Sequence, residues 1–133
     1  MDLATETALL DCTRGSDAGT MIFPQVIARL AAVNVERYHA DLVRAEKTYY
    51  LPDGTSRTLA CHKLDTPPAV QFSAPGIEAT IRAVQAGAID YKEFCRGIAQ
   101  AGCVFYLVSL TGRRAVYYGR TGEAHVEMFP PGK

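Results

Sequence analysis

Hydrophobic residues follow two different periods in the first third of the chain. Between residues 22 and 33 they recur every three or four positions, which predicts an amphipathic helix. After Asn34 the pattern alternates with period two, which predicts a strand. One face of this strand carries Glu36, Tyr38, Ala40 and Leu42, and the other carries Val35, Arg37, His39, Asp41 and Val43. The strand therefore has one polar face.

Two more strands are predicted before the middle of the chain. A β-rich stretch over residues 47–51 ends at Pro52-Asp53-Gly54, where the fixed φ of proline and the permissive glycine predict a tight turn. A further short strand is predicted near residues 57–61. The following segment, about 62–74, contains Pro67-Pro68 and mixed polar residues, which cannot hold a helix and fit a linker.

The second half begins with two predicted helices separated by a short break. Ser73 is a suitable N-cap for a helix that stops near Gly87. Asp90 and Glu93 then make a start that resembles a capping box, for a second helix that ends at Gly102.

Three strands are predicted after these helices. The run from residue 103 to 108 is apolar on both faces, which predicts a buried central strand. A two-residue turn within Thr111-Gly112-Arg113-Arg114 leads into a strand over residues 115–118. A last strand covers about 123–129 and precedes a Pro-Pro-Gly tail.

The chain also resembles itself. A shift of 68 residues aligns residues 9–54 with 77–122 without a gap, and nine of the 46 positions are identical, among them Tyr49-Tyr50 with Tyr117-Tyr118. We interpret this as an internal duplication, with repeats of about 5–58 and 73–126; the alternative is chance reuse of the same local rules. Each repeat then has the order helix, helix, strand, strand, which also predicts a helix over residues 5–18. The expected fold is a single α+β domain over residues 1–133, an antiparallel sheet with helices covering a face.

Length and charge narrow the class of protein. A chain of 133 residues suits one domain that buries roughly two thirds of its unfolded surface. Because 14 Lys and Arg balance 14 Asp and Glu, the net charge of zero excludes a histone-like or polybasic binder. No apolar run approaches the roughly 20 residues of a membrane helix. With no CxxC pair and no signal-peptide pattern, we expect a cytoplasmic protein with no membrane partner.

A candidate polar cluster lies on the polar face of the first strand. Arg37, His39 and Asp41 share that face, and a two-residue turn in the first hairpin would place Tyr50 opposite His39 and Thr48 opposite Asp41. A histidine flanked by a carboxylate and a tyrosine could shuttle protons, or bind an anion with help from Arg37. The alternative interpretation is a solvated sheet face with ordinary cross-strand pairs.

Two other groups of residues are candidate binding sites. His39 with Asp41, and His125 with Glu127, each place an imidazole and a carboxylate on one strand face, so neighbouring strands would offer four metal ligands. Because two-residue spacing is the commonest relation along any strand, we predict no metal site and no cofactor. A candidate basic patch near Tyr117 and Tyr118 could meet single-stranded nucleic acid or phosphate, but the zero net charge argues against it. It consists of Arg113, Arg114 and Arg120.

Several strings resemble a known family. They are residues 35–42 (VERYHADL), 46–50 (EKTYY), 101–103 (AGC), 110–114 (LTGRR) and 119–123 (GRTGE). Over about 20–130 the chain resembles the YdfO/YbcV family of small, often prophage-encoded bacterial proteins, a domain of unknown function sometimes labelled a phage envelope protein. The resemblance implies an α+β fold and a bacterial or phage origin, and it transfers no catalytic residue.

The second predicted hairpin supplies the leading hypothesis for function. Phe105, Leu107, Val116 and Tyr118 occupy the face equivalent to the polar face of the first hairpin, so either another element or a partner must cover them. We therefore expect a non-enzymatic interaction or regulatory module that forms a homodimer or docks a protein partner there. The alternatives are a small enzyme or ligand-binding protein that uses the polar cluster, and a nucleic-acid binder that uses the basic patch.

Overall fold

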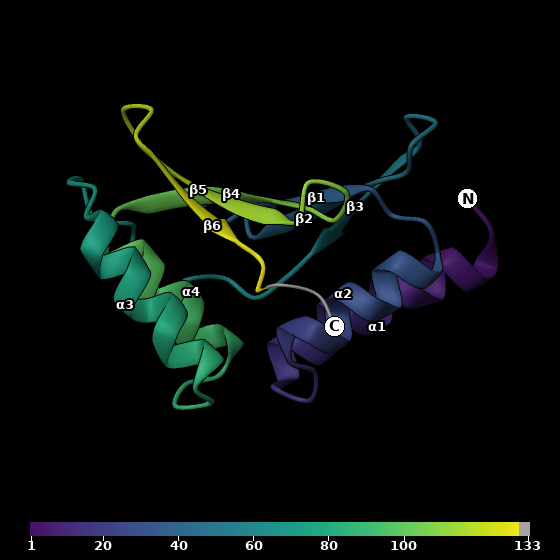
Figure 1. The fold of residues 1–133 in the computed structure, drawn as a ribbon, viewed down its shortest axis with the longest axis horizontal. Helices are drawn as coiled ribbons and strands as arrows, with labels where there is room; N and C mark the ends of the chain where they lie inside the picture. The colour runs from purple at the N-terminus through teal and green to yellow at the C-terminus, as the bar shows by residue number, and fades with distance from the viewer. Residues whose placement is uncertain (131–133) are drawn as a thin grey trace.

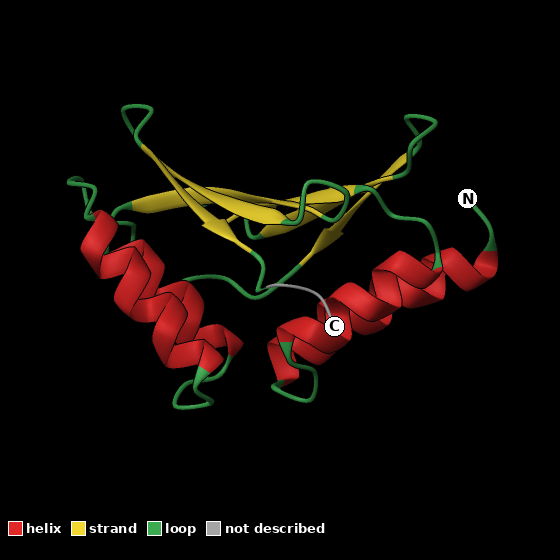
Figure 2. Ribbon diagram, in the orientation of Figure 1, coloured by secondary structure: helices red, strands yellow, loops and turns green. Residues whose placement is uncertain are grey.

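Four helices and six strands follow one another in two similar series. The structure is a computed structural model and describes residues 1–130, so the end of the predicted tail, residues 131–133, lies outside the described residues. It confirms the predicted α+β fold with an antiparallel sheet (Figure 2). The first series is α1 (Leu3–Ala18), α2 (Phe23–Ala32), β1 (Arg37–Asp41), β2 (Glu46–Tyr50) and β3 (Ser56–Ala60). The second is α3 (Ala74–Gln85), α4 (Tyr91–Gln100), β4 (Cys103–Ser109), β5 (Arg114–Gly119) and β6 (Ala124–Met128).

Three helices, α1, α3 and α4, start where the sequence supplies a capping side chain, whereas α2 starts at Ile22 without one. Ser73 Oγ accepts a hydrogen bond from the Gly76 amide at 3.0 Å at the start of α3. At the start of α4 the Glu93 amide donates to Asp90 Oδ1, and the Asp90 amide donates to Glu93 Oε1, both at 2.9 Å. Both predicted helix starts are therefore confirmed. Within residues 1–130, no helix has the length and apolar character needed to cross a bilayer.

All six strands form one antiparallel sheet in the order β3-β2-β1-β4-β5-β6. The first strands of the two series, β1 and β4, pair in the middle and join the series into one sheet. Figure 1 shows all four helices on the same face, with α1 and α2 below one half of the sheet and α3 and α4 below the other half. Among residues 1–130, no helix lies on the opposite face.

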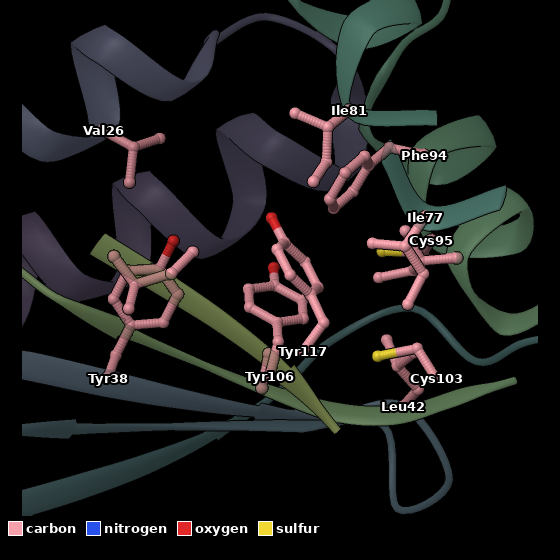
Figure 3. Packing of buried hydrophobic residues seen from close by; sticks show 14 of the residues in the cluster. Val26, Tyr38, Leu42, Ile77, Ile81, Phe94, Cys95, Cys103, Tyr106 and Tyr117 are labelled. Carbon is pink, nitrogen blue, oxygen red and sulfur yellow. The ribbon is translucent and has the colours of Figure 1, made fainter. Parts of the chain in front are cut away.

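The core lies between the sheet and the helices, and tyrosines fill its centre (Figure 3). Strand residues at every second position are buried, as a sheet with one covered face requires. Tyr38 and Tyr49 have ring centroids 5.3 Å apart, and Tyr106 and Tyr117 have centroids 5.4 Å apart. Because the Thr13 hydroxyl donates to the Leu9 carbonyl, the Tyr49 hydroxyl donates the 2.8 Å hydrogen bond that it shares with Thr13.

The two series have the same backbone path at their turns. The bounds of α2 and α4, and of β3 and β6, differ by 68 residues, and so do the registers of the hairpins. Residues with left-handed backbone conformation also fall into pairs 68 residues apart. The pairs are Gly19 with Gly87, Asn34 with Gly102, Ala45 with Arg113, and Gly54 with Gly122. The third strand of each series, which the repeat order helix, helix, strand, strand did not include, lies where the local pattern predicted it.

The predicted two-residue turn in the first hairpin of each series is wrong. The loops contain four residues, 42–45 and 110–113. In the first loop Asp41 Oδ1 accepts hydrogen bonds from two loop amides at 3.0 Å, and Ala45 adopts a left-handed φ of 57°. The longer loop shifts the pairing by two residues, so that Thr48 lies opposite His39 and Tyr50 lies opposite Arg37.

The predicted burial of the run from 103 to 108 on both faces is also wrong. β4 is central in the sheet, as predicted. Its residue Phe105 is nevertheless 39% exposed, because the four helices described lie on the other face of the sheet. The apolar residues on both faces of this strand therefore indicate an exposed apolar surface, not a strand that is buried on both faces.

Two glycines with nearly the same φ allow a test of what Gly102 contributes to stability. Gly102 has a φ of 92°, and a Cβ there would lie 2.3 Å from the Gln71 carbonyl oxygen. Gly54 has a φ of 90° and open space around it. In urea unfolding, we expect Gly54→Ala to lower the free energy of unfolding by about 1–2 kcal/mol through backbone strain alone. Gly102→Ala should lose about 1–3 kcal/mol more, because the linker must move. Equal losses would contradict this close contact.

Candidate functional site

The sheet face opposite the helices is the candidate site, and we call it the open face. It is formed by the strand residues that alternate with the buried ones. Residues of β1, β2 and β3 form its polar half, and residues of β4, β5 and β6 form its apolar half. The polar half consists of Arg37, His39, Asp41, Glu46, Thr48, Tyr50, Ser56, Thr58 and Ala60. The apolar half is dominated by Phe105, Leu107, Val116, Tyr118, Val126 and Met128.

The apolar half is continuous across three strands and is not covered by any helix of residues 1–130. Phe105 and Tyr118 stack with ring centroids 4.6 Å apart, and Leu107 lies opposite Val116. Phe105 is 39% exposed, and on β6 Val126 is 48% and Met128 51% exposed. The four residues predicted from sequence are therefore joined by two that the prediction missed. Their alternation with His125 and Glu127 along β6 was the available signal.

The predicted polar cluster lies on the polar half, in a different pairing from the one expected. The Arg37 guanidinium lies over the Tyr50 ring, 4.1 Å from its centroid, and the His39 ring centroid is 4.9 Å from that of Tyr50. Thr48 shares a 2.8 Å hydrogen bond with Thr58 on β3. The structure thus brings Arg37 and His39 into contact with the Tyr50 ring, with Thr48 opposite His39.

A shallow pocket of about 290 Å³ lies at the boundary between the two halves. Its lining includes two carboxylates, because Asp41 at the end of β1 pairs with Glu46 at the start of β2. The pocket is lined by His39, Ala40, Asp41, Glu46, Thr48 and Phe105. It is therefore an acid-lined hollow with an aromatic wall.

The electrostatics of this region do not pair the histidine with a carboxylate. Burial, and secondly the Arg37 guanidinium, lower the pKa of His39, so its imidazole is neutral at pH 7. The Asp41 carboxylate accepts hydrogen bonds from the amides of Val43 and Arg44, and so holds the loop. The Glu46 carboxylate accepts a 3.0 Å hydrogen bond from Arg44. The arrangement fits recognition of a cation in the hollow better than proton transfer through His39.

The structure does not bring the three arginines of the candidate basic patch together. Arg113 and Arg114 lie at the start of β5, whereas Arg120 follows its other end. Arg113 donates to the Pro130 carbonyl at 3.2 Å and lies over the Phe129 ring. Arg120 donates to the Pro68 carbonyl of the linker. Two of the three side chains therefore hold the chain's own segments.

The two histidine–carboxylate pairs considered for a metal lie apart. β4 and β5 separate β1 from β6, and His39 lies on the open face whereas His125 lies on the helix face. A different cluster forms instead, in which His125 Nε2 lies 2.7 Å from Glu78 Oε2 of α3 and one ligand atom from each of Glu78, His125 and Glu127 lies within 4.8 Å of the others.

The imidazole and the two carboxylates are groups that can bind a divalent cation, but both carboxylates already form ion pairs with an arginine. The Arg82 guanidinium contacts Glu78 and lies 3.1 Å from Glu127. The hydrogen bond with His125, and the nearby Arg82, lower the pKa of Glu78. The cluster connects α3 to β6. Glu78 was missed by the sequence analysis, although its i,i+4 spacing from Arg82 was a readable signal.

A buried lysine on the helix face was also missed. Lys47 is 3% exposed, and its Nζ lies 4.1 Å from the Tyr91 ring centroid and 5.9 Å from that of Tyr38. Burial lowers the pKa of this lysine. The sequence did carry the signal, because Lys47 and Tyr49 are two residues apart and therefore share the core face of β2.

Comparison with known proteins gives a family but no activity. The model of a family described as "Protein of unknown function (DUF1398)" matches residues 16–127. No curated protein matches the chain. The finer resemblance to the YdfO/YbcV proteins, and a prophage origin, stay predictions.

The buried lysine generates a test of stability. We expect Lys47→Met to raise the free energy of unfolding at pH 7 by about 1–3 kcal/mol, because it removes a charge that the folded protein holds out of water. The folded-state pKa of Lys47 is lowered, so its cost is full below that pKa and disappears as pH rises toward the ordinary value of 10.5. The advantage of the variant in denaturant unfolding should therefore be largest at neutral pH and should shrink at alkaline pH.

The matched control is Lys63→Met, at an exposed lysine, which should change stability by no more than about 0.5 kcal/mol. Burial raises the pKa of tyrosines such as Tyr38 and Tyr106, so their hydroxyls stay protonated in the folded protein over the pH range of this comparison. A Lys47→Met protein less stable than the wild type at pH 7 would show that the contact with the Tyr91 ring outweighs the cost of burying the charge.

Proposed function

The chain belongs to the DUF1398 family of proteins of unknown function, and we propose that it is a non-enzymatic interaction module that docks a folded protein through its open face. The apolar half supplies the binding free energy, and the polar half sets the orientation of the partner. Such a module has a regulatory role if docking changes the activity of its partner.

The observation that carries this proposal is the exposure of the apolar half. Contiguous apolar surface on a soluble protein marks an interaction site, because each buried Å² contributes about 25 cal/mol. Val126 and Met128 are about half exposed at one side of this surface, and Phe105 is 39% exposed at the other. A partner that covered the three strands would remove all of these side chains from water.

The groups that an enzyme would need are engaged elsewhere. Asp41 holds its loop, and Arg37 covers Tyr50. Burial raises the pKa of Cys95 to about 12 and that of Cys103 to about 12, so both thiols stay protonated and are poor nucleophiles. The alternative of a ligand-binding protein or enzyme that uses Arg37, His39, Asp41 and Tyr50 therefore has less support, and so does nucleic-acid binding.

We also propose that the two halves arose by internal duplication. The support is the spacing of 68 residues, which relates the identical sequence positions, the strand registers and the four pairs of left-handed residues. Local rules alone would not place a non-glycine residue, Ala45 or Arg113, in the left-handed region at equivalent positions of both halves.

Site-specific crosslinking tests the docking surface. A photo-crosslinking amino acid at Val126, in cells that express the protein, should form a covalent adduct with one defined protein, identified by mass spectrometry. The matched control is the same amino acid at Lys92, which is exposed on α4 on the helix side of the sheet and should form no such adduct. An absence of adducts at Val126, or the same adducts at both positions, would contradict docking through the open face.

A further inference from the structure

The charged residues of the open face identify the kind of partner that fits it. Resting on the proposed function, we infer that the protein docked there is a second copy of this chain. The two copies are related by a two-fold axis that lies between the sheets and runs perpendicular to the strands. Each copy then inserts its Arg37 into the acid-lined pocket of the other.

Opposite charges lie at opposite ends of the strands on this face. Arg37 pairs with Ser109, which pairs with Arg114, so the two arginines share one end, the arginine end. Asp41 pairs with Glu46, so the two carboxylates share the other end, the carboxylate end, where Arg44 donates one hydrogen bond to Glu46 and leaves Asp41 without a cationic partner among residues 1–130. A face with this arrangement is complementary to a reversed copy of itself.

Only one orientation of two stacked sheets satisfies both the apolar contacts and the charges. An axis perpendicular to the strands stacks each strand on its own copy, so apolar half covers apolar half and arginine end covers carboxylate end. An axis parallel to the strands through the apolar half would place Arg114 over Arg114 of the partner subunit. The same axis through the middle of the sheet would cover the apolar half with the polar half.

The pocket lies where this orientation needs a hollow. With the perpendicular axis, Arg37 lies over Asp41 of the partner subunit and beside Glu46 of the partner subunit. Both carboxylates line the pocket of about 290 Å³. One guanidinium nitrogen of Arg37 contacts Glu36 within its own chain, which leaves the other nitrogens to donate to the partner. Arg114 lies over the Phe105–Tyr118 ring stack of the other copy, a favourable site for a guanidinium.

Shape and size also fit a second copy. The twist of the sheet (Figure 1) makes the open face a saddle, and a saddle fits a copy of itself that is turned over about an axis in the sheet. Strands of five residues, six of them side by side, give a footprint of about 500 Å². This is below the about 800 Å² per partner of a standard interface, so we expect a weak and reversible dimer.

Charge exchange tests the orientation. Sedimentation equilibrium of the wild-type protein should show a reversible monomer–dimer equilibrium. Arg37→Glu should raise the dissociation constant of the dimer at least about tenfold, because the new carboxylate would face Asp41 and Glu46 of the partner subunit. The double variant Asp41→Asn, Glu46→Lys should weaken it similarly, and its asparagine keeps an acceptor for the loop amides. In an equimolar mixture of the two variants, the dissociation constant of the mixed dimer should return to within a few-fold of the wild-type value, since each arginine or lysine then faces a carboxylate.

Recovery in the mixture also shows that both variants are folded. Lys92→Glu, which changes the same charge on the helix side, should leave the equilibrium unchanged. A wild-type protein that stays monomeric up to near-millimolar concentration, or a dimer that neither variant weakens, or a mixture that does not recover, would overturn the inference. The crosslink at Val126 separates the two failures: an adduct with a different protein overturns the second copy alone, and no adduct overturns the proposed function as well.

Discussion

The antiparallel pairing of β1 with β4 is the contact on which the rest of the structure depends. Each half of the chain is a pair of helices on three strands, with β1 or β4 as an edge whose backbone groups need a partner. Pairing the two edges satisfies these groups and places Tyr38 beside Tyr106 in a shared core. Because the core side chains of both halves point the same way, both helix pairs must lie on one face, and the other face must stay uncovered.

The same backbone therefore carries two differently constrained sets of side chains. On the core face, the central tyrosines keep their residue at positions 68 residues apart, as Tyr38 and Tyr106 do, whereas the buried Lys47 corresponds to Ala115. On the open face such positions change character, with Leu107 where the first half has His39, and Val126 where it has Thr58. The core limits change on one face, because a tyrosine there packs against helices and other tyrosines. No helix of residues 1–130 packs on the open face, so its side chains are free of that constraint, and there one half is polar and the other apolar.

Local signals allowed the elements to be predicted, and long-range contacts account for what was missed. Helix starts at Ser73 and Asp90 depend on side chains a few residues away and were readable. The hairpin register was not, because it depends on whether Asp41 caps a four-residue loop. The repeat predicted that Phe105 is exposed, whereas the apolar run around it predicted that it is buried. The position of both helix pairs on one face of the sheet decides between these predictions, and it is a long-range property. The pocket and the Glu78 cluster combine residues that are distant in sequence, so spacing could indicate the pair of Glu78 with Arg82 but not its contact with β6.

The difference between the two halves also decides how a second copy can bind. The pairing of His39 with Leu107 marks a pseudo-two-fold axis through the centre of the sheet, which exchanges the polar half with the apolar half. If the two halves were identical, this axis would make the two in-plane orientations of a partner sheet equivalent. Because the exchange replaces Arg37 by Phe105 and Glu46 by Arg114, the two orientations differ in charge and in apolar overlap. The difference between the two halves thus gives the proposed dimer one favourable orientation in place of two equivalent ones, and this supplies specificity without a new fold.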